Sequence, residues 1–249
     1  MNITILTASY NCEDTILDCI KAVDDQSFVN LEHIVVDGKS EDATFNLLSA
    51  QLKPNRIIVS EKDKGLYDAL NKGLALSSGD VVGILHADDV YADSEVLSRV
   101  SEYFTNPEVL LVYGDLVYVD KVDLFKIVRN WISGKFPSPN LKKGWMPPHP
   151  TLFMRRSLYD KFGSFDKRYK ISADYDFILR IFSHLTPEQV VYIPEVLVKM
   201  RTGGVSNRSF KHLMQKSWED YQIIRRHKIG GLGTLFRKNI SKLPQFFTK

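Results

Sequence analysis

Two adjacent carboxylates, Asp88 and Asp89, follow an apolar run in the segment ILHADDVY, residues 84–91. Neighbouring like charges repel each other, and an apolar interior does not stabilise either charge without a partner. Mg²⁺ and Mn²⁺ prefer oxygen ligands and are commonly held by one or two carboxylates together with substrate phosphates. The pair therefore predicts a Mg²⁺ or Mn²⁺ site. The alternative interpretation is a helix N-cap ahead of VYADSEVL.

Polar residues also follow the other apolar runs in the first half of the chain. In VVDGKSEDAT, Asp37 ends such a run and precedes a glycine turn. A carboxylate at this position can accept hydrogen bonds from a base N–H or a ribose hydroxyl, or it can form a simple Asx turn.

The segment DKGLYDALNKG is a third polar stretch of this kind. Asp68 and Asn71 could bind sugar hydroxyls, and Lys72 could bind phosphate. Lys72 could equally be a solvated surface lysine.

Alternating strands and helices must position these residues. The expected strands are 3–9, 31–38, 55–61 and 80–89, and the expected helices are 12–26, 40–52 and 66–79. Runs that are apolar on both faces and alternate with helices form a parallel sheet covered on both sides. Open α/β sheets bind ligands at the carboxyl ends of their strands, which is where the polar residues fall. The fold class predicted is therefore α/β.

The rhythm changes after residue 105. VLLVYGDLVYVD, residues 109–120, reads as one strand, and residues 121–150 read as irregular, proline-rich chain. A helix is expected at about 173–185, followed by two short strands, VVYIP and VLVKM.

Composition narrows the class of protein. The chain has 249 residues, 44% hydrophobic and 25% charged, as in ordinary soluble proteins. We expect neither a transmembrane helix nor a signal peptide, because no apolar run approaches 18 residues and the N-terminus reads as a strand. Two cysteines predict a reducing cytoplasm and no disulfide framework. The phosphate-loop, GxGxxG and GxSxG motifs are all missing from the sequence.

The segments TASYN, DGKSEDAT, EKDKGLYDALNKG and HADD, in this order and spacing, resemble the GT-A glycosyltransferases of family 2. The resemblance covers roughly residues 1–205 and is closest to bacterial enzymes of exopolysaccharide, colanic-acid or lipopolysaccharide assembly. It implies a GT-A fold, with a Rossmann-like, mostly parallel sheet, and an inverting, metal-dependent transfer of a sugar from a nucleotide diphosphate.

The resemblance also implies roles for individual residues. Thr7, Ser9 and Asp37 would lie around the nucleotide. HADD stands where the family carries its DxD motif, with His86 at the first acidic position. This departure leaves open which of the two following aspartates binds metal and which touches ribose.

The segment ISADYDFILR matches the family segment that carries the catalytic base. An inverting transfer needs a carboxylate that takes the proton from the attacking acceptor hydroxyl. We expect Asp174 to be this base, with Asp176 as the nearby alternative. Asp176 and Arg180, at i and i+4, more simply form a structural ion pair.

Two further residues are candidates at the substrate sites. His149, in PPHPTLF, falls where similar enzymes border the acceptor, and it could instead be an ordinary hydrogen-bonded histidine. Arg201 and the glycines of MRTGGVS could close over the diphosphate or form a plain turn.

The charge of the chain is uneven. Residues 208–249 contain ten Lys or Arg and two Asp or Glu, a net charge of +8 in a chain whose total is +3. We therefore divide the chain into a catalytic domain, 1–205, and a basic, helical, amphipathic tail, 206–249. The domain would comprise a nucleotide-sugar half, 1–105, and an acceptor half, 106–205.

The tail is expected to have two parts. Its first part carries an apolar stripe expected to pack on the catalytic domain: Phe210, Leu213, Met214, Trp218, Tyr221 and Ile224. The part beyond about residue 225 mixes basic and apolar residues and predicts docking on an anionic membrane surface. Nucleic acid is not expected as a partner, because no recognition motif accompanies the charge.

Three functions remain open. The leading hypothesis is a cytoplasmic glycosyltransferase, peripheral on the inner face of the cell membrane, that uses a UDP- or GDP-linked sugar and a glycan or lipid-linked acceptor. A nucleotidyltransferase is disfavoured, because its glycine-rich loop after the first strand is missing. The third is a catalytically inactive sugar-nucleotide-binding or scaffold protein, which need not keep a carboxylate at Asp174.

Overall fold

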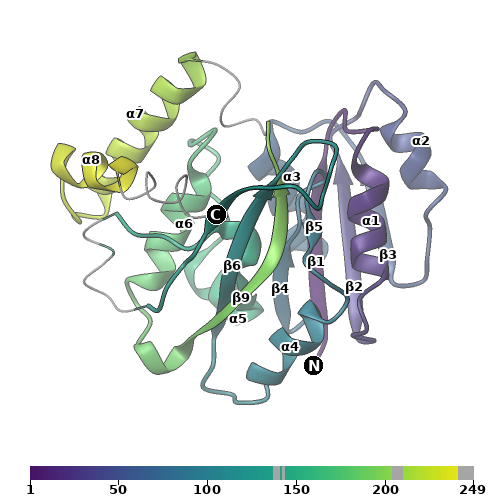
Figure 1. The fold of residues 1–249 in the computed structure, drawn as a ribbon, viewed down its shortest axis with the longest axis horizontal. Coiled ribbons are helices and arrows are strands. Elements are labelled where there is room, and N and C mark those ends of the chain that lie inside the picture. Colours follow the sequence, from purple (N-terminus) through teal and green to yellow (C-terminus); the bar gives the residue numbers. More distant parts are fainter. Residues whose placement is uncertain (137–140, 142–143, 204–209, 241–249) are drawn as a thin grey trace.

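The structure is a computed structural model, and it describes residues 1–136, 141, 144–203 and 210–240. A nine-stranded sheet runs through the molecule, with helices on both of its faces and two C-terminal helices at one end (Figure 1). The strand order is β3-β2-β1-β4-β8-β6-β9-β5, and β7 pairs with β6 outside this path. The predicted α/β class with a helical C-terminal tail is confirmed.

The first half of the sheet is parallel, as predicted. Its strands are β1 (Ile3–Ser9), β2 (Leu31–Asp37), β3 (Arg56–Ser60) and β4 (Val81–Ile84). The helices that alternate with them are α1 (Ile16–Asp24), α2 (Thr44–Ser49) and α3 (Leu66–Leu76). Successive residues of β1 point to opposite faces, so that Ile5 packs with α1 and Leu6 with α3. Both faces are therefore covered, and the polar strand ends share one edge.

The second half of the sheet is mixed. It contains β5 (Val90–Tyr91), β6 (Leu111–Val119), β8 (Phe153–Arg155) and β9 (Val190–Arg201). Strand β8 is antiparallel to both β4 and β6, whereas β6 and β9 are parallel. Its helices are α4 (Val96–Tyr103), α5 (Arg156–Phe162) and α6 (Ala173–Phe182), with single 3₁₀ turns at His149–Thr151 and Pro187–Gln189.

Two expectations for this half were wrong. A strand, β7 (Ile127–Trp131), lies inside the stretch expected to be irregular, and it forms an antiparallel hairpin with β6. The two short strands expected near residue 194 are one strand, β9. Its register against β6 shifts between Tyr113 and Asp115, which accommodates Pro194, a residue that has no N–H to donate.

The C-terminal helices are α7 (Phe210–Arg226) and α8 (Leu232–Ile240). The expected packing stripe on α7 was largely wrong: Leu213, Met214 and Trp218 are exposed, whereas Ile223 and Ile224 are buried in the core. The side chain of Phe210 lies outside the described residues. None of the described helices is long and apolar enough to cross a membrane.

Candidate active site

The acidic pair follows β4 at the polar edge of the sheet. Asp88 is partly exposed, whereas Asp89 is fully buried. The Asp89 Oδ1 atom accepts a long hydrogen bond of 3.3 Å from the Arg201 backbone N–H, and its Oδ2 has no hydrogen-bond partner among the described residues. Burial, together with the neighbouring charge of Asp88, raises the pKa of Asp89 well above its usual value. A cation would relieve both the repulsion and the unpartnered oxygen.

The donor set around the pair is small. Within the described residues, no group of three or more His, Cys, Asp or Glu side chains is arranged to hold a metal ion. Two carboxylates nevertheless suit Mg²⁺ or Mn²⁺ when a diphosphate supplies the remaining oxygens. The residues present therefore fit a metal that arrives with its substrate.

Arg201 lies behind the acidic pair. Its side chain is 4% exposed, donates to the Asp88 carbonyl at 2.9 Å, and pairs with Asp18 of α1 at 2.5 Å. These contacts fix the turn that carries the two aspartates. In this position the guanidinium supports the acidic turn, and its predicted contact with a diphosphate stays a prediction. Of the adjoining glycines, Gly204 lies outside the described residues.

A chain of hydrogen bonds links the ends of four separate segments. His86, after β4, lies 2.6 Å from His149, measured between the two Nε2 atoms. His149 Nδ1 lies 3.1 Å from Asp174 Oδ2 at the start of α6. Tyr67 of α3 donates to Asp174 Oδ1 at 3.0 Å and to the Ile171 carbonyl at 2.8 Å. Three predicted site residues, His86, His149 and Asp174, are thus brought together.

The protonation of this chain follows from its surroundings. Burial and the adjacent His149 lower the pKa of His86 to about 3, so that His86 is neutral at physiological pH. Burial alone would raise the pKa of Asp174, but the electrostatic interaction and hydrogen bond with His149, together with the charge of Lys238 and a backbone hydrogen bond, hold that pKa below its usual value. Asp174 is therefore an ionised carboxylate, with one oxygen facing a phenol and the other facing an imidazole.

A small cavity adjoins this carboxylate. Its apolar lining accounts for the effect of burial on the pKa of Asp174. Besides His149 and Asp174, the lining residues are Ile84, Leu152, Met154, Phe165, Phe177 and Ile178. The side chains of Asp174 and His149 keep 15% and 26% exposure. The carboxylate is therefore not fully closed off from solvent.

The predicted nucleotide residues at the ends of β1 and β2 fall into two groups. Ser9 and Asp37 meet at 3.5 Å, and Asp37 also accepts bonds from the hydroxyls of Ser40 and Ser60. The Ser40 backbone N–H completes an Asx-type turn. Asp37 is 0% exposed and forms the Asx turn that was the alternative interpretation of this residue. Its contact with a nucleotide stays a prediction.

Thr7 lies deeper than Ser9. Its hydroxyl donates to the Leu85 carbonyl at 2.9 Å and contacts His33 Nε2 at 3.0 Å. Burial and the nearby Arg56 lower the pKa of His33 to about 3, so a neutral imidazole joins Thr7 to Arg56. Thr7 is therefore part of a buried hydrogen-bond network below the site in this structure.

The polar residues of α3 contact neighbouring loops. Asn71 makes two hydrogen bonds to the backbone of Phe165, and Asp68 pairs with Lys167 at 2.8 Å. Lys72 pairs with Glu61 at 2.9 Å. Their roles toward a donor stay predictions, but the structure already gives each a partner.

Asp176 points away from Asp174, as expected for residues two apart on a helix. It is fully buried and pairs with Arg180 at 2.6 Å, so the predicted ion pair is confirmed. His227, directly after the end of α7, adds a contact at 2.9 Å to the other oxygen of the same carboxylate.

Helix α7 contributes to the site in a way that its sequence did not predict. Glu219 is 5% exposed and accepts three backbone hydrogen bonds, from Lys170, Ile171 and Ser172, at 3.1, 2.9 and 2.9 Å. These N–H groups form the turn that opens α6 immediately before Asp174. On α8, Lys238 is buried against Tyr175 and pairs with Asp220 at 2.6 Å. The only signal was that Glu219 and Asp220 are the two acids in a strongly basic tail.

Comparison with known proteins adds the following. Residues 4–163 match the model of the family described as glycosyl transferase family 2. The chain is 31% identical over 210 residues to a PGL/p-HBAD biosynthesis glycosyltransferase of Mycobacterium bovis, covering 82% of this chain and 78% of that one. It is 25% identical over 220 residues to the Escherichia coli UDP-Glc:alpha-D-GlcNAc-diphosphoundecaprenol beta-1,3-glucosyltransferase WfaP, covering 86% and 84%.

Solved structures share the fold. The crystal structure of Staphylococcus aureus TarS 1-349 in complex with UDP-GlcNAc superposes with a TM-score of 0.70 at 17% identity, over 91% of this chain and 65% of that chain. The mannosyltransferase PcManGT from Pyrobaculum calidifontis, in complex with GDP-Man and Mn²⁺, gives a TM-score of 0.67 at 18% identity, over 98% and 70%. These likenesses establish a GT-A type fold.

Proposed function

We propose that this chain, which belongs to glycosyl transferase family 2, transfers a sugar with inversion from a nucleoside diphosphate to a hydroxyl of a lipid-linked glycan. The observation that carries the proposal is the ionised Asp174, held between Tyr67 and His149. It lies in the segment where an inverting transfer needs its base.

In the proposed reaction, the acceptor oxygen attacks the anomeric carbon from the face opposite the leaving group. The bond from that carbon to the diphosphate oxygen breaks, and the hydroxyl proton moves to Asp174. His149 Nε2 already faces His86 at 2.6 Å, so His149 acts here as a positioning residue that orients and stabilises the carboxylate. General-base help of this kind is worth about 10²–10⁴ in rate.

The donor would bind at the acidic pair. Asp88, the more exposed of the two, would be the metal ligand, with Asp89 behind it. A bound Mg²⁺ or Mn²⁺ would offset the charge that develops on the leaving diphosphate. A mannosyltransferase of the same fold has been solved with GDP-Man and Mn²⁺, which supports a metal-dependent donor site.

A donor screen tests the proposal. The chain is incubated with Mn²⁺ and a panel of UDP- and GDP-sugars, and release of the nucleoside diphosphate is followed with and without a glycan acceptor. Release from one donor, stimulated by an acceptor, is the expected result. Binding of a donor without any release would instead support a catalytically inactive sugar-nucleotide-binding protein.

The acceptor and the location belong to the same proposal. One relative is named for a diphosphoundecaprenol-linked acceptor, which supports a lipid-linked acceptor here. Helices α7 and α8 present exposed apolar side chains beside a net charge of +8 in residues 208–249: Met214 and Trp218 at 61%, Leu232 at 70%, Phe236 at 67% and Ile240 at 44%. An anionic membrane surface on the cytoplasmic side fits this combination, each basic residue adding about 1 kcal/mol near the lipid.

Vesicle pelleting tests the membrane contact. Leu232→Glu with Phe236→Glu should reduce pelleting with phosphatidylglycerol vesicles and spare turnover of a water-soluble acceptor. Val29→Glu, at a position 86% exposed near β2, is the matched control and should pellet as the wild type does. Equal pelleting of the double variant and the wild type would argue against docking through α8. The apolar residues beyond 240 lie outside the described residues.

A further inference from the structure

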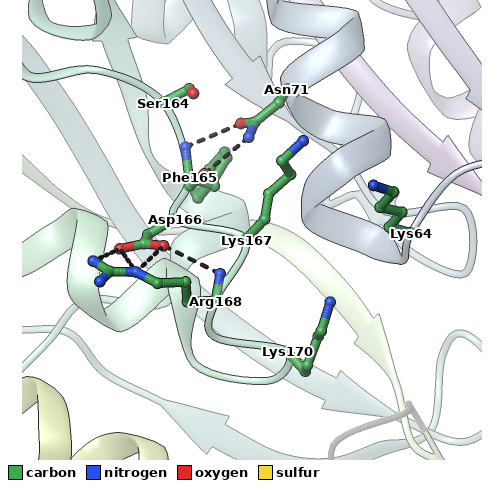
Figure 2. Close-up of a pocket in the computed structure, with 8 residues that line it drawn as sticks. All are labelled: Lys64, Asn71, Ser164, Phe165, Asp166, Lys167, Arg168 and Lys170. Atoms are coloured by element: carbon green, nitrogen blue, oxygen red, sulfur yellow. Dashed lines mark hydrogen bonds and ion pairs between the residues drawn. The ribbon is translucent and has the colours of Figure 1, made fainter.

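A basic groove lies between the start of α3 and the segment 164–170 that precedes α6 (Figure 2). Its volume is about 590 Å³. It is lined by four cationic side chains, one carboxylate and three uncharged residues: Lys64, Lys167, Arg168 and Lys170, Asp166, and Asn71, Ser164 and Phe165. Its lining is therefore strongly positive, in contrast to the acidic turn after β4.

The cations differ in how they are engaged. Lys167 pairs with Asp68 at 2.8 Å, and Arg168 pairs with Asp166 at 2.6 Å. Within the described part of the chain, Lys64 and Lys170 form no ion pair, and both line the groove. Figure 2 shows the Lys170 side chain extending toward α3 and Lys64 beside the start of that helix. Two ammonium groups that line one groove and are not paired with a carboxylate suit a phosphate ligand.

The groove adjoins the catalytic carboxylate. Phe165 lines both the groove and the cavity beside Asp174. Its ring packs against Tyr67, at 5.5 Å between ring centroids, and the Tyr67 hydroxyl donates to Asp174. The two sites are thus separated by one layer of aromatic side chains. A sugar attached to a phosphate in the groove could extend over Tyr67 and Phe165 to Asp174.

We propose that this groove binds the diphosphate that links the acceptor sugar to its lipid. The proposal rests on the proposed function, and it adds a recognition site on the side of α3 that faces the segment 164–170. The donor diphosphate is assigned elsewhere, to the acidic pair after β4, where a metal is needed. The groove has cations of its own, so it requires no metal.

Calorimetry with geranyl diphosphate tests the site directly. This probe carries a lipid diphosphate without a sugar, and the titration is done in EDTA. We expect the wild type to bind it and to bind geraniol undetectably. In the double variant Lys64→Ala, Lys170→Ala the affinity should fall by about tenfold or more, because two charge-assisted hydrogen bonds to the diphosphate are lost. Both lysines are exposed, so the fold should be retained.

Three controls separate the sources of phosphate. The double variant Lys21→Ala, Lys53→Ala removes the same charge from exposed lysines outside the groove and should bind the probe as the wild type does. Binding of UDP or GDP with Mn²⁺, and pelleting with phosphatidylglycerol vesicles, should be unchanged in the groove variant. A parallel loss in either assay would overturn the assignment, because the groove would then serve the donor or a lipid headgroup.

Two further results would overturn the inference: no binding of geranyl diphosphate by the wild type, or equal binding by the groove variant. Failure of the proposed function has a different signature. In that case no nucleoside diphosphate would be released from any donor, whether or not the groove binds the probe.

Discussion

His149 Nδ1 lies 3.1 Å from the Asp174 carboxylate and couples the 3₁₀ turn after the proline-rich segment to the first turn of α6. The contact has an electrostatic consequence. Burial raises the pKa of Asp174, and His149 supplies the largest opposing effect. The pKa of this carboxylate therefore depends in part on an imidazole 25 residues earlier in the chain.

Replacing His149 should move the pH profile of turnover. A base works only when it is ionised, so the acid limb of kcat/KM follows the pKa of Asp174. In His149→Asn the burial remains and the interaction with the imidazole is lost, so the pKa of Asp174 rises and the acid limb moves to higher pH. Between pH 4 and 9 the measured rate of the wild type should show no acid limb from this carboxylate, because its pKa lies below that range, whereas the variant should lose rate toward pH 4. His184→Asn, at an exposed histidine bonded to the Arg180 carbonyl, should keep the wild-type profile. An unshifted acid limb in His149→Asn would show that His149 does not control the base.

The sequence predicted this part of the site unevenly. His86, His149 and Asp174 were each singled out, because their segments HADD, PPHPTLF and ISADYDFILR resemble segments of the family that carry site residues. Their mutual contacts were not predictable, because they depend on β8 lying between β4 and β6. A strand of three residues with no alternation leaves almost no periodic signal.

Asp88 and Asp89 should be needed for metal-dependent donor binding. Asp88→Asn should lower the affinity for the donor with Mn²⁺ by at least about 100-fold. Loss of a residue that only hydrogen-bonds to a metal ligand costs about 10–100-fold, and loss of the ligand itself should cost more. Calorimetry with and without Mn²⁺ measures the effect, and Asp88→Asn together with Asp89→Asn should abolish the metal-dependent part. The control is Asp93→Asn, whose carboxylate pairs with Arg99 at 2.9 Å on the surface. Wild-type affinity in the double variant would remove the metal site from this turn.

Glu219 should support turnover from a distance. In Glu219→Gln only one side-chain oxygen remains for three backbone N–H groups, so the turn before Asp174 shifts. A misplacement of about 1 Å costs about 100-fold in rate, so kcat should fall by up to that factor while donor affinity is kept. Glu219→Asp keeps both oxygens and should recover part of the loss.

Glu102→Gln, on the exposed face of α4, is the control for this charge and should behave as the wild type does. A purely structural role of Glu219 would appear as a lower melting temperature with unchanged kcat per folded molecule. That outcome would contradict a positioning role.

The C-terminal helices also show where sequence reasoning stops. The apolar periodicity of α7 correctly indicated a helix, but it placed the buried face wrongly. The buried residues of α7 include Glu219 and Asp220 beside Ile223 and Ile224, and His227 follows directly after the helix. Polar side chains that are buried in ion pairs or hydrogen bonds do not appear in a hydrophobic pattern, so the sequence does not show that they are buried. The exposed apolar face, by contrast, has the signature usually read as a core.

The most direct test of the account is the turnover of Asp174→Asn. The substitution nearly preserves shape but removes the proton acceptor. We predict that donor binding with Mn²⁺ survives and that kcat falls by about 10²–10⁴. Asp176→Asn, which loses pairs with Arg180 and His227, should instead lower the melting temperature and keep kcat. Normal turnover in Asp174→Asn, with loss of turnover and intact donor binding in Asp176→Asn, would contradict the assignment of the base.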